Sequence, residues 1–232
     1  MKHIGIAGIT VPGSILCIET IVKESYKHFG SETTIHPQIT YTNQSLRETD
    51  PPIHNKQWGI VAKNLLKSIE ILHKAGVDFV VIPSNSPHYA IKEVQEKSPV
   101  PVVSIVDITV EECKKRKFKK VGILGVDITM SDGLYEEPLK RAGIIPVTLS
   151  PEKQKAVHEL IYKEIIKGRP TAKTSEKMRT FIQELKDLGC DGFIAGCTEI
   201  PVVIKSENES PLPFVDTTRL LAQVAFCKTL EE

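Results

Sequence analysis

The chain has 232 residues, of which 41% are hydrophobic and 25% are charged, and its formal net charge at pH 7 is +1. The length suits one large domain or two small ones, and the composition is ordinary for a soluble globular protein. A charge so close to zero excludes the basic field that attracts nucleic acid, and no apolar run reaches the roughly 18 residues that a membrane helix needs.

The chain begins with an apolar stretch over residues 4–18, which glycines and a proline interrupt. No small-residue cleavage site follows, so we interpret the stretch as mature structure and not as a leader. Within it, "AGITVPGS" (7–14) predicts a turn from a strand into a helix. The run matches neither GxGxxG nor the P-loop, so a phosphate site is not supported. The helix N-terminus at Ser14 is still a candidate to hold a small anion.

Short apolar strands alternate with amphipathic helical patterns along the rest of the chain. The predicted strands are residues 4–7, 79–82, 102–106, 121–124, 192–195 and 214–215. The predicted helices include residues 61–72, 134–141, 155–166 and 175–188. This alternation predicts an α/β fold with mainly parallel sheets.

The two halves of the chain match each other. "IEILHKAGVDFVVIPSN" (69–85) aligns without a gap with "IQELKDLGCDGFIAGCT" (182–198), so that Ser84 meets Cys197. "IGIAG" (4–8) matches "VGILG" (121–125), and "SPVPVV" (98–103) matches "SPLPFV" (210–215). Generic similarity between βαβ units is the alternative. Three matches in the same order favour a duplicated unit, with two similar α/β domains related by a pseudo-two-fold axis.

Ser84 and Cys197 each follow the carboxyl end of a predicted strand, where open α/β sheets bind their ligands. If the two halves face each other, these side chains approach one ligand from opposite sides. Two proton-transfer groups in that arrangement can remove a proton from one face of a carbon and return it to the other. The expected chemistry is therefore stereoinversion.

Cys197 lies in "AGCTEIP" (195–201), at a turn ahead of a possible helix N-terminus. There, backbone N–H groups and the helix dipole are expected to lower the thiol pKa toward neutrality, and Thr198 is a candidate carboxylate binder. No C-x-x-C pair predicts a zinc site or a disulfide framework, which suits a reducing cytoplasm. We interpret the other four cysteines as structural: Cys17, Cys113, Cys190 and Cys227.

The loop "PSNSPH" (83–88) offers Asn85 and Ser86 as donors for a substrate carboxylate. His88 either polarises the Ser84 hydroxyl or holds the loop, and the residues alone leave both alternatives open. Other candidates also have a plain structural alternative. Thr129 contacts substrate or caps a helix, and Arg47 is a carboxylate clamp or an exposed loop arginine. The histidines show no metal-ligand spacing.

With these motifs the chain resembles the aspartate/glutamate racemase family over essentially its whole length. The resemblance rests on "IGIAG", on "VGILG…TM" (121–130), on "PSNSPH" in the place of a family pattern Pro-Cys-Asn-Thr-x-His, and above all on "GCTEI" (196–200). The chain departs from the family where Ser84 stands in the place of a cysteine. It departs again in its opening, which reads "GITVPGS" instead of Gly-Gly-Met-x-Pro-x-Ala-Thr.

The resemblance implies racemisation of an acidic amino acid, aspartate or glutamate or both, with no cofactor and no metal. Cys197 is then one base and Ser84 stands in the place of the other. The implied domains are residues 1–100 with 210–232, and residues 101–209. Similar proteins are often dimers, so a homodimer is an option. The remaining candidates are substrate-binding Asn85, Ser86, Thr198, Thr129, Arg47 and Ser14, and supporting His88 and Glu199.

Two other functions stay open. One is a one-cysteine decarboxylase or cis–trans isomerase of a dicarboxylate, because such a reaction needs only one thiol and a carboxylate-binding loop. The other is a non-catalytic binding protein that has lost one of its two bases.

Overall fold

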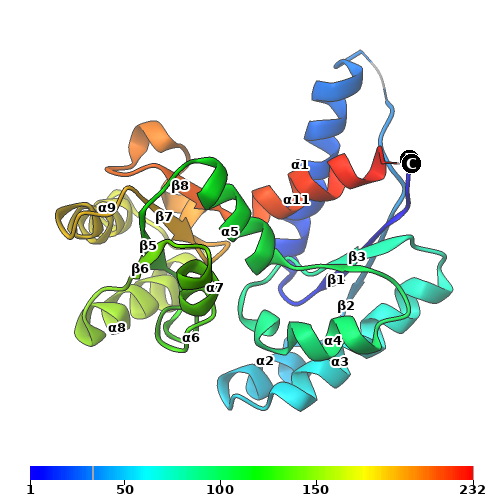
Figure 1. Cartoon of the computed structure of the whole chain (residues 1–232), viewed down its shortest axis with the longest axis horizontal. Coiled ribbons are helices and arrows are strands. Elements are labelled where there is room, and N and C mark those ends of the chain that lie inside the picture. The colour runs from blue at the N-terminus through cyan, green and yellow to red at the C-terminus, as the bar shows by residue number, and fades with distance from the viewer. Residues whose placement is uncertain (33, 232) are drawn as a thin grey trace. The chain divides into compact units, whose positions relative to one another are not determined.

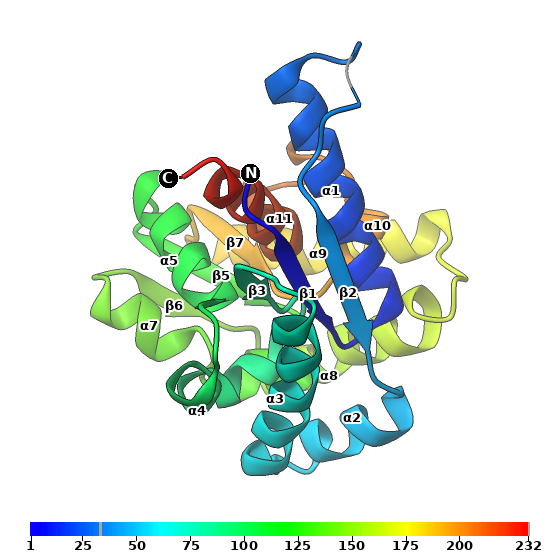
Figure 2. The ribbon, with the colours of Figure 1, turned by 90° about the vertical axis from the view of Figure 1, so that its right-hand side faces the viewer.

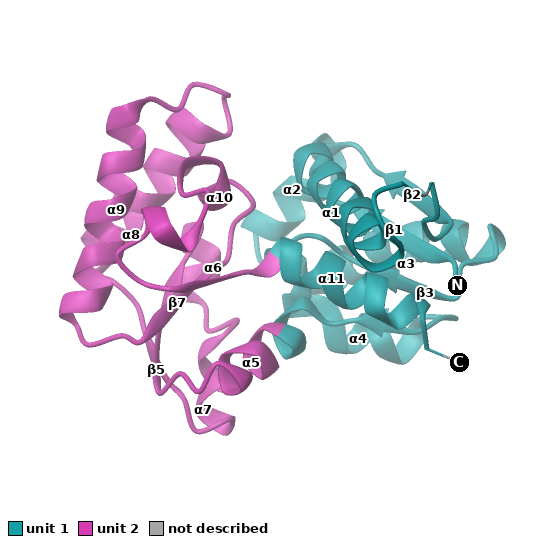
Figure 3. Ribbon diagram, turned by 90° about the horizontal axis from the view of Figure 1, so that it is seen from above, with its two compact units in different colours: residues 1–108, 218–232 teal, residues 109–217 magenta. Residues whose placement is uncertain are grey.

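The computed structural model describes residues 1–32 and 34–231. The chain forms two compact units, residues 1–108 with 218–232 and residues 109–217 (Figure 3). Within the described ranges, no helix is both long and apolar enough to cross a membrane.

The first unit contains a four-stranded sheet in the order β2-β1-β3-β4, in which every pair is parallel. Figure 2 labels three of these strands, β2, β1 and β3. Helices α1 and α11 cover one face of this sheet, and α3 and α4 cover the other (Figure 1). The strands are β1 (Ile4–Gly8), β2 (Ile39–Asn43), β3 (Phe79–Val81) and β4 (Val102–Val103). The helices are α1 (Val11–Phe29), α2 (Leu46–His54), α3 (Trp58–Lys74), the 3-10 turn η1 (Ser86–Ala90), α4 (Ile91–Lys97) and α11 (Thr217–Thr229). Helix α5 (Ile105–Lys115) begins in this unit and ends in the other.

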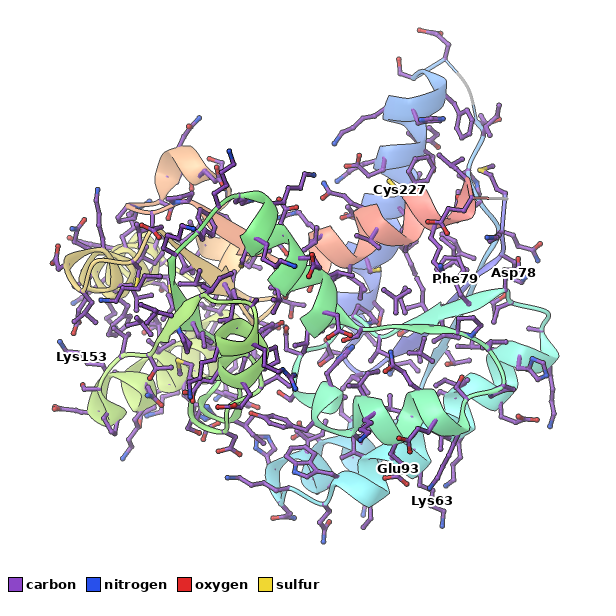
Figure 4. All side chains as sticks on the ribbon, in the orientation of Figure 1. Lys63, Asp78, Phe79, Glu93, Lys153 and Cys227 are labelled. Atoms are coloured by element: carbon purple, nitrogen blue, oxygen red, sulfur yellow. The ribbon has the colours of Figure 1, made fainter. Side chains whose placement is uncertain are left out.

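The C-terminal helix α11 completes the first unit. The Lys2 N–H donates to the Thr229 carbonyl oxygen at 3.0 Å, which ties this helix to the start of the chain. The Phe226 ring meets Phe29 of α1 edge to face, with centroids 6.3 Å apart. At the last turn, Lys228 Nζ is 5.8 Å from the ring centroid of Phe79 on β3 (Figure 4). Residues from both ends of the sequence therefore share one core.

The second unit contains a second four-stranded sheet with the same arrangement of strands, in the order β6-β5-β7-β8, and again every pair is parallel. Lys153 of α8, which Figure 4 labels, forms an ion pair with Glu184 of α9. The strands are β5 (Lys120–Leu124), β6 (Ile145–Val147), β7 (Gly192–Ala195) and β8 (Phe214–Asp216). The helices are α6 (Asp127–Ser131), α7 (Glu136–Arg141), α8 (Pro151–Leu160), the π-helical turn η2 (Ile161–Ile165), α9 (Ala172–Asp187), α10 (Ile200–Val203) and the 3-10 turn η3 (Glu207–Glu209). The predicted fold of two similar α/β domains with mainly parallel sheets is confirmed.

Two details of the sequence prediction need correction. The strand predicted over residues 102–106 is only Val102–Val103, because Ser104 accepts the Asp107 N–H at 3.2 Å and caps the start of α5. The expected boundaries after residues 100 and 209 would also assign β4 to the second domain and β8 to the first. Instead, β4 pairs with β3 and β8 pairs with β7, and the compact units change over after residues 108 and 217.

Candidate active site

In the first unit, the candidate residues lie at the carboxyl edge of the sheet. Strands β1 and β3 are parallel neighbours, so the loops after Gly8 and Val81 emerge at the same edge. The first loop leads to Ser14 in α1, and the second carries Ser84 and Asn85. One sheet edge therefore presents candidates that are far apart in the sequence.

His88 holds the Ser84 loop through its backbone. Its Nδ1 lies 2.8 Å from the Ser84 carbonyl oxygen, and its Nε2 accepts the Ile105 N–H at 3.1 Å. Both contacts are satisfied by the tautomer that carries its hydrogen on Nδ1. Burial lowers the pKa of His88 to about 4, so the ring is neutral. Of the two alternatives, this geometry matches loop-holding, because neither ring nitrogen is directed to the Ser84 hydroxyl.

The other candidates of the first unit differ in exposure. Asn85 is buried, with 4% of its surface exposed, whereas Ser86 is half-buried at the start of η1. Ser14 is fully buried, and its hydroxyl donates to the Thr10 carbonyl oxygen at 3.0 Å. Arg47 is exposed in the first turn of α2, after the Ser45 cap.

Tyr41 and Asn43 were not predicted as site residues, yet the side chains of both reach this edge. A Cβ on Gly8 would lie 2.5 Å from both Ser14 Oγ and Tyr41 Cε2, and 2.8 Å from Asn43 Oδ1. Glycine at the end of β1 thus lets three side chains approach the backbone. These two residues belong to β2, a strand that the sequence prediction missed.

In the second unit, Thr129 and Cys197 follow the neighbouring parallel strands β5 and β7. A Cβ on Gly196 would lie 2.9 Å from Thr129 Cγ2 and 3.1 Å from the Leu124 carbonyl oxygen. The Thr129 methyl group therefore packs against the backbone just before Cys197. Its hydroxyl is buried and has no hydrogen-bond partner among the described residues, which costs free energy unless a ligand supplies one.

Cys197 faces a carboxylate. Its Sγ–H donates to Glu199 Oε2 at 2.9 Å, and the Thr198 hydroxyl donates to the same oxygen at 2.6 Å. Burial raises the pKa of the Cys197 thiol well above its usual value, and the negative charge and hydrogen bond of Glu199 raise it further. The expected lowering toward neutrality is therefore wrong for the free protein. The local backbone N–H groups act in that direction but do not offset burial, and α10 is only a four-residue helix.

A second contact between two titratable side chains in this unit was not predicted. His158 Nδ1 of α8 lies 3.1 Å from Asp127 Oδ1, at the start of the short helix that carries Thr129. The two residues are 31 positions apart, so sequence spacing offers no signal for the contact. Elsewhere in the described chain, no group of three or more His, Cys, Asp or Glu side chains is placed to hold a metal ion.

The chain is similar to known proteins of one family. The model of the Asp/Glu/Hydantoin racemase family matches residues 6–225. The broad specificity amino-acid racemase RacX of Bacillus subtilis (strain 168) is 27% identical over 220 residues, which cover 94% of this chain and 93% of that protein. The glutamate racemase of Aquifex aeolicus (strain VF5) is 29% identical over 157 residues, but the match spans only 59% of its length.

A solved structure is also similar over the full length of both chains. An aspartate racemase homologue from Pyrococcus horikoshii OT3 superposes with a TM-score of 0.86 at 27% sequence identity, and the match covers 100% of each chain. The similarity therefore extends over both units.

Proposed function

Because this chain belongs to the Asp/Glu/Hydantoin racemase family, we propose that it racemises an acidic amino acid, aspartate or glutamate or both, without a cofactor. The reaction removes the hydrogen of the α-carbon as a proton and returns a proton to the opposite face.

One observation carries this proposal. Ser84 and Cys197 follow the third strand of each unit, β3 and β7, in two sheets with the same strand order. The repeated fold thus supplies two chemically different groups at equivalent positions. In our proposal Cys197 acts as the base on one face of the α-carbon, and Ser84 serves the other face.

The proposed substrate contacts use groups that can donate a hydrogen bond to a carboxylate. The buried Thr129 hydroxyl lacks a described partner, so a bound carboxylate would satisfy it. Asn85, Ser86 and Thr198 are the proposed partners of the α-carboxylate. Exposed Arg47 is the proposed partner of the distal carboxylate, since a guanidinium binds such a group through two parallel hydrogen bonds.

A second candidate is one-thiol chemistry on a dicarboxylate, either decarboxylation or cis–trans isomerisation. The observation that favours it is the His88 geometry: both ring nitrogens contact backbone groups, so His88 is not placed to activate the Ser84 hydroxyl. A serine hydroxyl is a weaker acid than a thiol and transfers protons poorly without such help.

The test follows pure L- and D-aspartate and L- and D-glutamate in deuterated water, with wild type and Cys197→Ala. Proton NMR measures loss of the α-hydrogen, and chiral chromatography measures inversion. We expect both in the wild type and neither in the folded variant. Turnover of maleate or a malonate with inert amino acids would replace this proposal by the second candidate, and saturable binding without exchange would leave only a binding protein.

A further inference from the structure

Three consecutive side chains form a hydrogen-bonded group at the end of β7. Glu199 Oε2 accepts two hydrogen bonds, from Cys197 Sγ at 2.9 Å and from Thr198 Oγ1 at 2.6 Å. All three residues are half-buried. The thiol and the carboxylate thus lie within direct proton-transfer distance.

From this geometry we propose that Glu199 accepts the proton of the Cys197 thiol and that Thr198 controls the transfer. The inference rests on the proposed function, in which the Cys197 thiolate is the base. As the S–H bond breaks, an O–H bond forms on Glu199, and the net charge of the pair stays at −1. The thiolate then takes the α-hydrogen of the substrate as a proton and becomes a thiol again. On the reverse path each bond is remade in the opposite order.

Thr198 can control this transfer because a threonine hydroxyl has a single hydrogen to donate. In the free protein that hydrogen stabilises the Glu199 carboxylate, which keeps the other proton on sulfur. A substrate carboxylate that takes the Thr198 hydrogen bond removes one of the two donors from Glu199. The carboxylate then holds a proton more readily, so substrate binding itself generates the thiolate.

The first experiment measures thiolate formation without any substrate. Iodoacetamide alkylates thiolate, and its rate at Cys197 follows the thiolate fraction. The tryptic peptide 187–205 contains both Cys190 and Cys197, so fragment ions must assign the label. We expect Thr198→Val to raise the rate at least threefold at pH 7, with Thr198→Ser within twofold of wild type. Glu199→Gln should also raise the alkylation rate, since it removes the negative charge that disfavours the Cys197 thiolate.

The second experiment measures racemisation in the same variants. We expect Glu199→Gln to racemise on the order of 100-fold more slowly at pH 7, as for loss of a general base. Its rate should climb with pH in parallel with Cys197 alkylation, because only thiolate formed before binding can react. Glu199→Asp should recover part of the activity, and Glu176→Gln, an exposed change on α9, should match wild type.

The inference would be overturned by wild-type racemisation in Glu199→Gln at pH 7, or by an alkylation rate that neither Glu199→Gln nor Thr198→Val raises. Loss of both alkylation and racemisation in a folded Glu199→Gln variant would assign Glu199 a structural role and would also overturn it. If the wild type racemises no amino acid, the proposed function fails, and the alkylation rates still decide whether Glu199 and Thr198 govern the thiol proton.

Discussion

His88 donates a hydrogen bond from Nδ1 to the Ser84 carbonyl oxygen at 2.8 Å, so the position of the candidate catalytic serine depends on a buried, neutral imidazole. The other ring nitrogen accepts the Ile105 N–H at the start of α5. One side chain therefore joins the Ser84 loop to the helix that leads into the second unit.

This buried imidazole predicts a specific loss of stability in acid. The pKa of His88 is lowered from 6.5 to about 4, so the unfolded chain binds the proton first. The stabilisation is complete above pH 6.5 and is lost as the pH falls toward 4, with a total of about 3 kcal/mol. Urea unfolding between pH 4 and 7 should show a weaker pH dependence in His88→Gln. His73→Gln, an exposed change on α3, should retain the wild-type dependence.

Gly196→Ala should damage both stability and activity. The new Cβ would lie 2.9 Å from Thr129 Cγ2 and 3.1 Å from the Leu124 carbonyl oxygen, and such overpacking costs about 1–3 kcal/mol. Displacement of the adjacent Cys197 should lower turnover at least tenfold. The matched control is Gly59→Ala in α3, where no atom lies within 4 Å of the added Cβ. A Gly196→Ala variant as stable and active as this control would contradict the packing argument.

Ser84→Cys should raise racemase turnover on the best acidic amino acid. A thiol is a stronger acid than a hydroxyl and exchanges protons more readily near neutral pH. In the internal alignment Ser86 is the counterpart of Glu199. A cysteine at position 84 would therefore have a serine, and not a carboxylate, two residues further along the chain. Steady-state rates in both directions provide the measurement. A tenfold drop, equivalent to about 1.4 kcal/mol, in a folded variant would show that the site is adapted to a hydroxyl.

The unequal pair also predicts unequal hydrogen exchange. Enantiomers have equal free energies, so kcat/KM must be the same in both directions, but the rates of hydrogen exchange can differ between them. If Cys197 removes the α-hydrogen and Ser84 returns a proton slowly, most carbanions regain a proton from Cys197 after the thiol has exchanged with solvent. One enantiomer should then gain deuterium faster than it inverts. Equal ratios of exchange to inversion from both pure enantiomers would refute the unequal-base mechanism.

Where the sequence was informative, a buried apolar run marked the element. All five residues of β1 are buried, and its glycine-bounded pattern predicted the strand. The edge strands β2 and β6 were missed because their residues are only partly buried or exposed, and because polar residues interrupt β2 and Pro146 interrupts β6. The end of β4 was misjudged because Val and Ile continue past it, although Ser104 with Asp107 three residues later is a helix-start signal.

The candidate site could likewise be predicted only in part from the sequence. The strand-end positions of Ser84 and Cys197 could be predicted, because each residue follows an apolar run typical of a buried strand. The protonation of Cys197 could not, because it depends on burial and on the direction of the Glu199 side chain. The contact of His88 with Ile105 joins residues 17 positions apart, and no local pattern encodes it.

The return of α11 to the first unit has a consequence for synthesis on the ribosome. Residues 109–217 form an uninterrupted unit, whereas the first unit needs residues 218–232 as well. All residues of the second unit are therefore translated before most of the helix whose Phe226 packs on Phe29 and whose Thr229 bonds to Lys2. The half of the chain that is translated first thus depends on the residues translated last to cover part of its apolar surface.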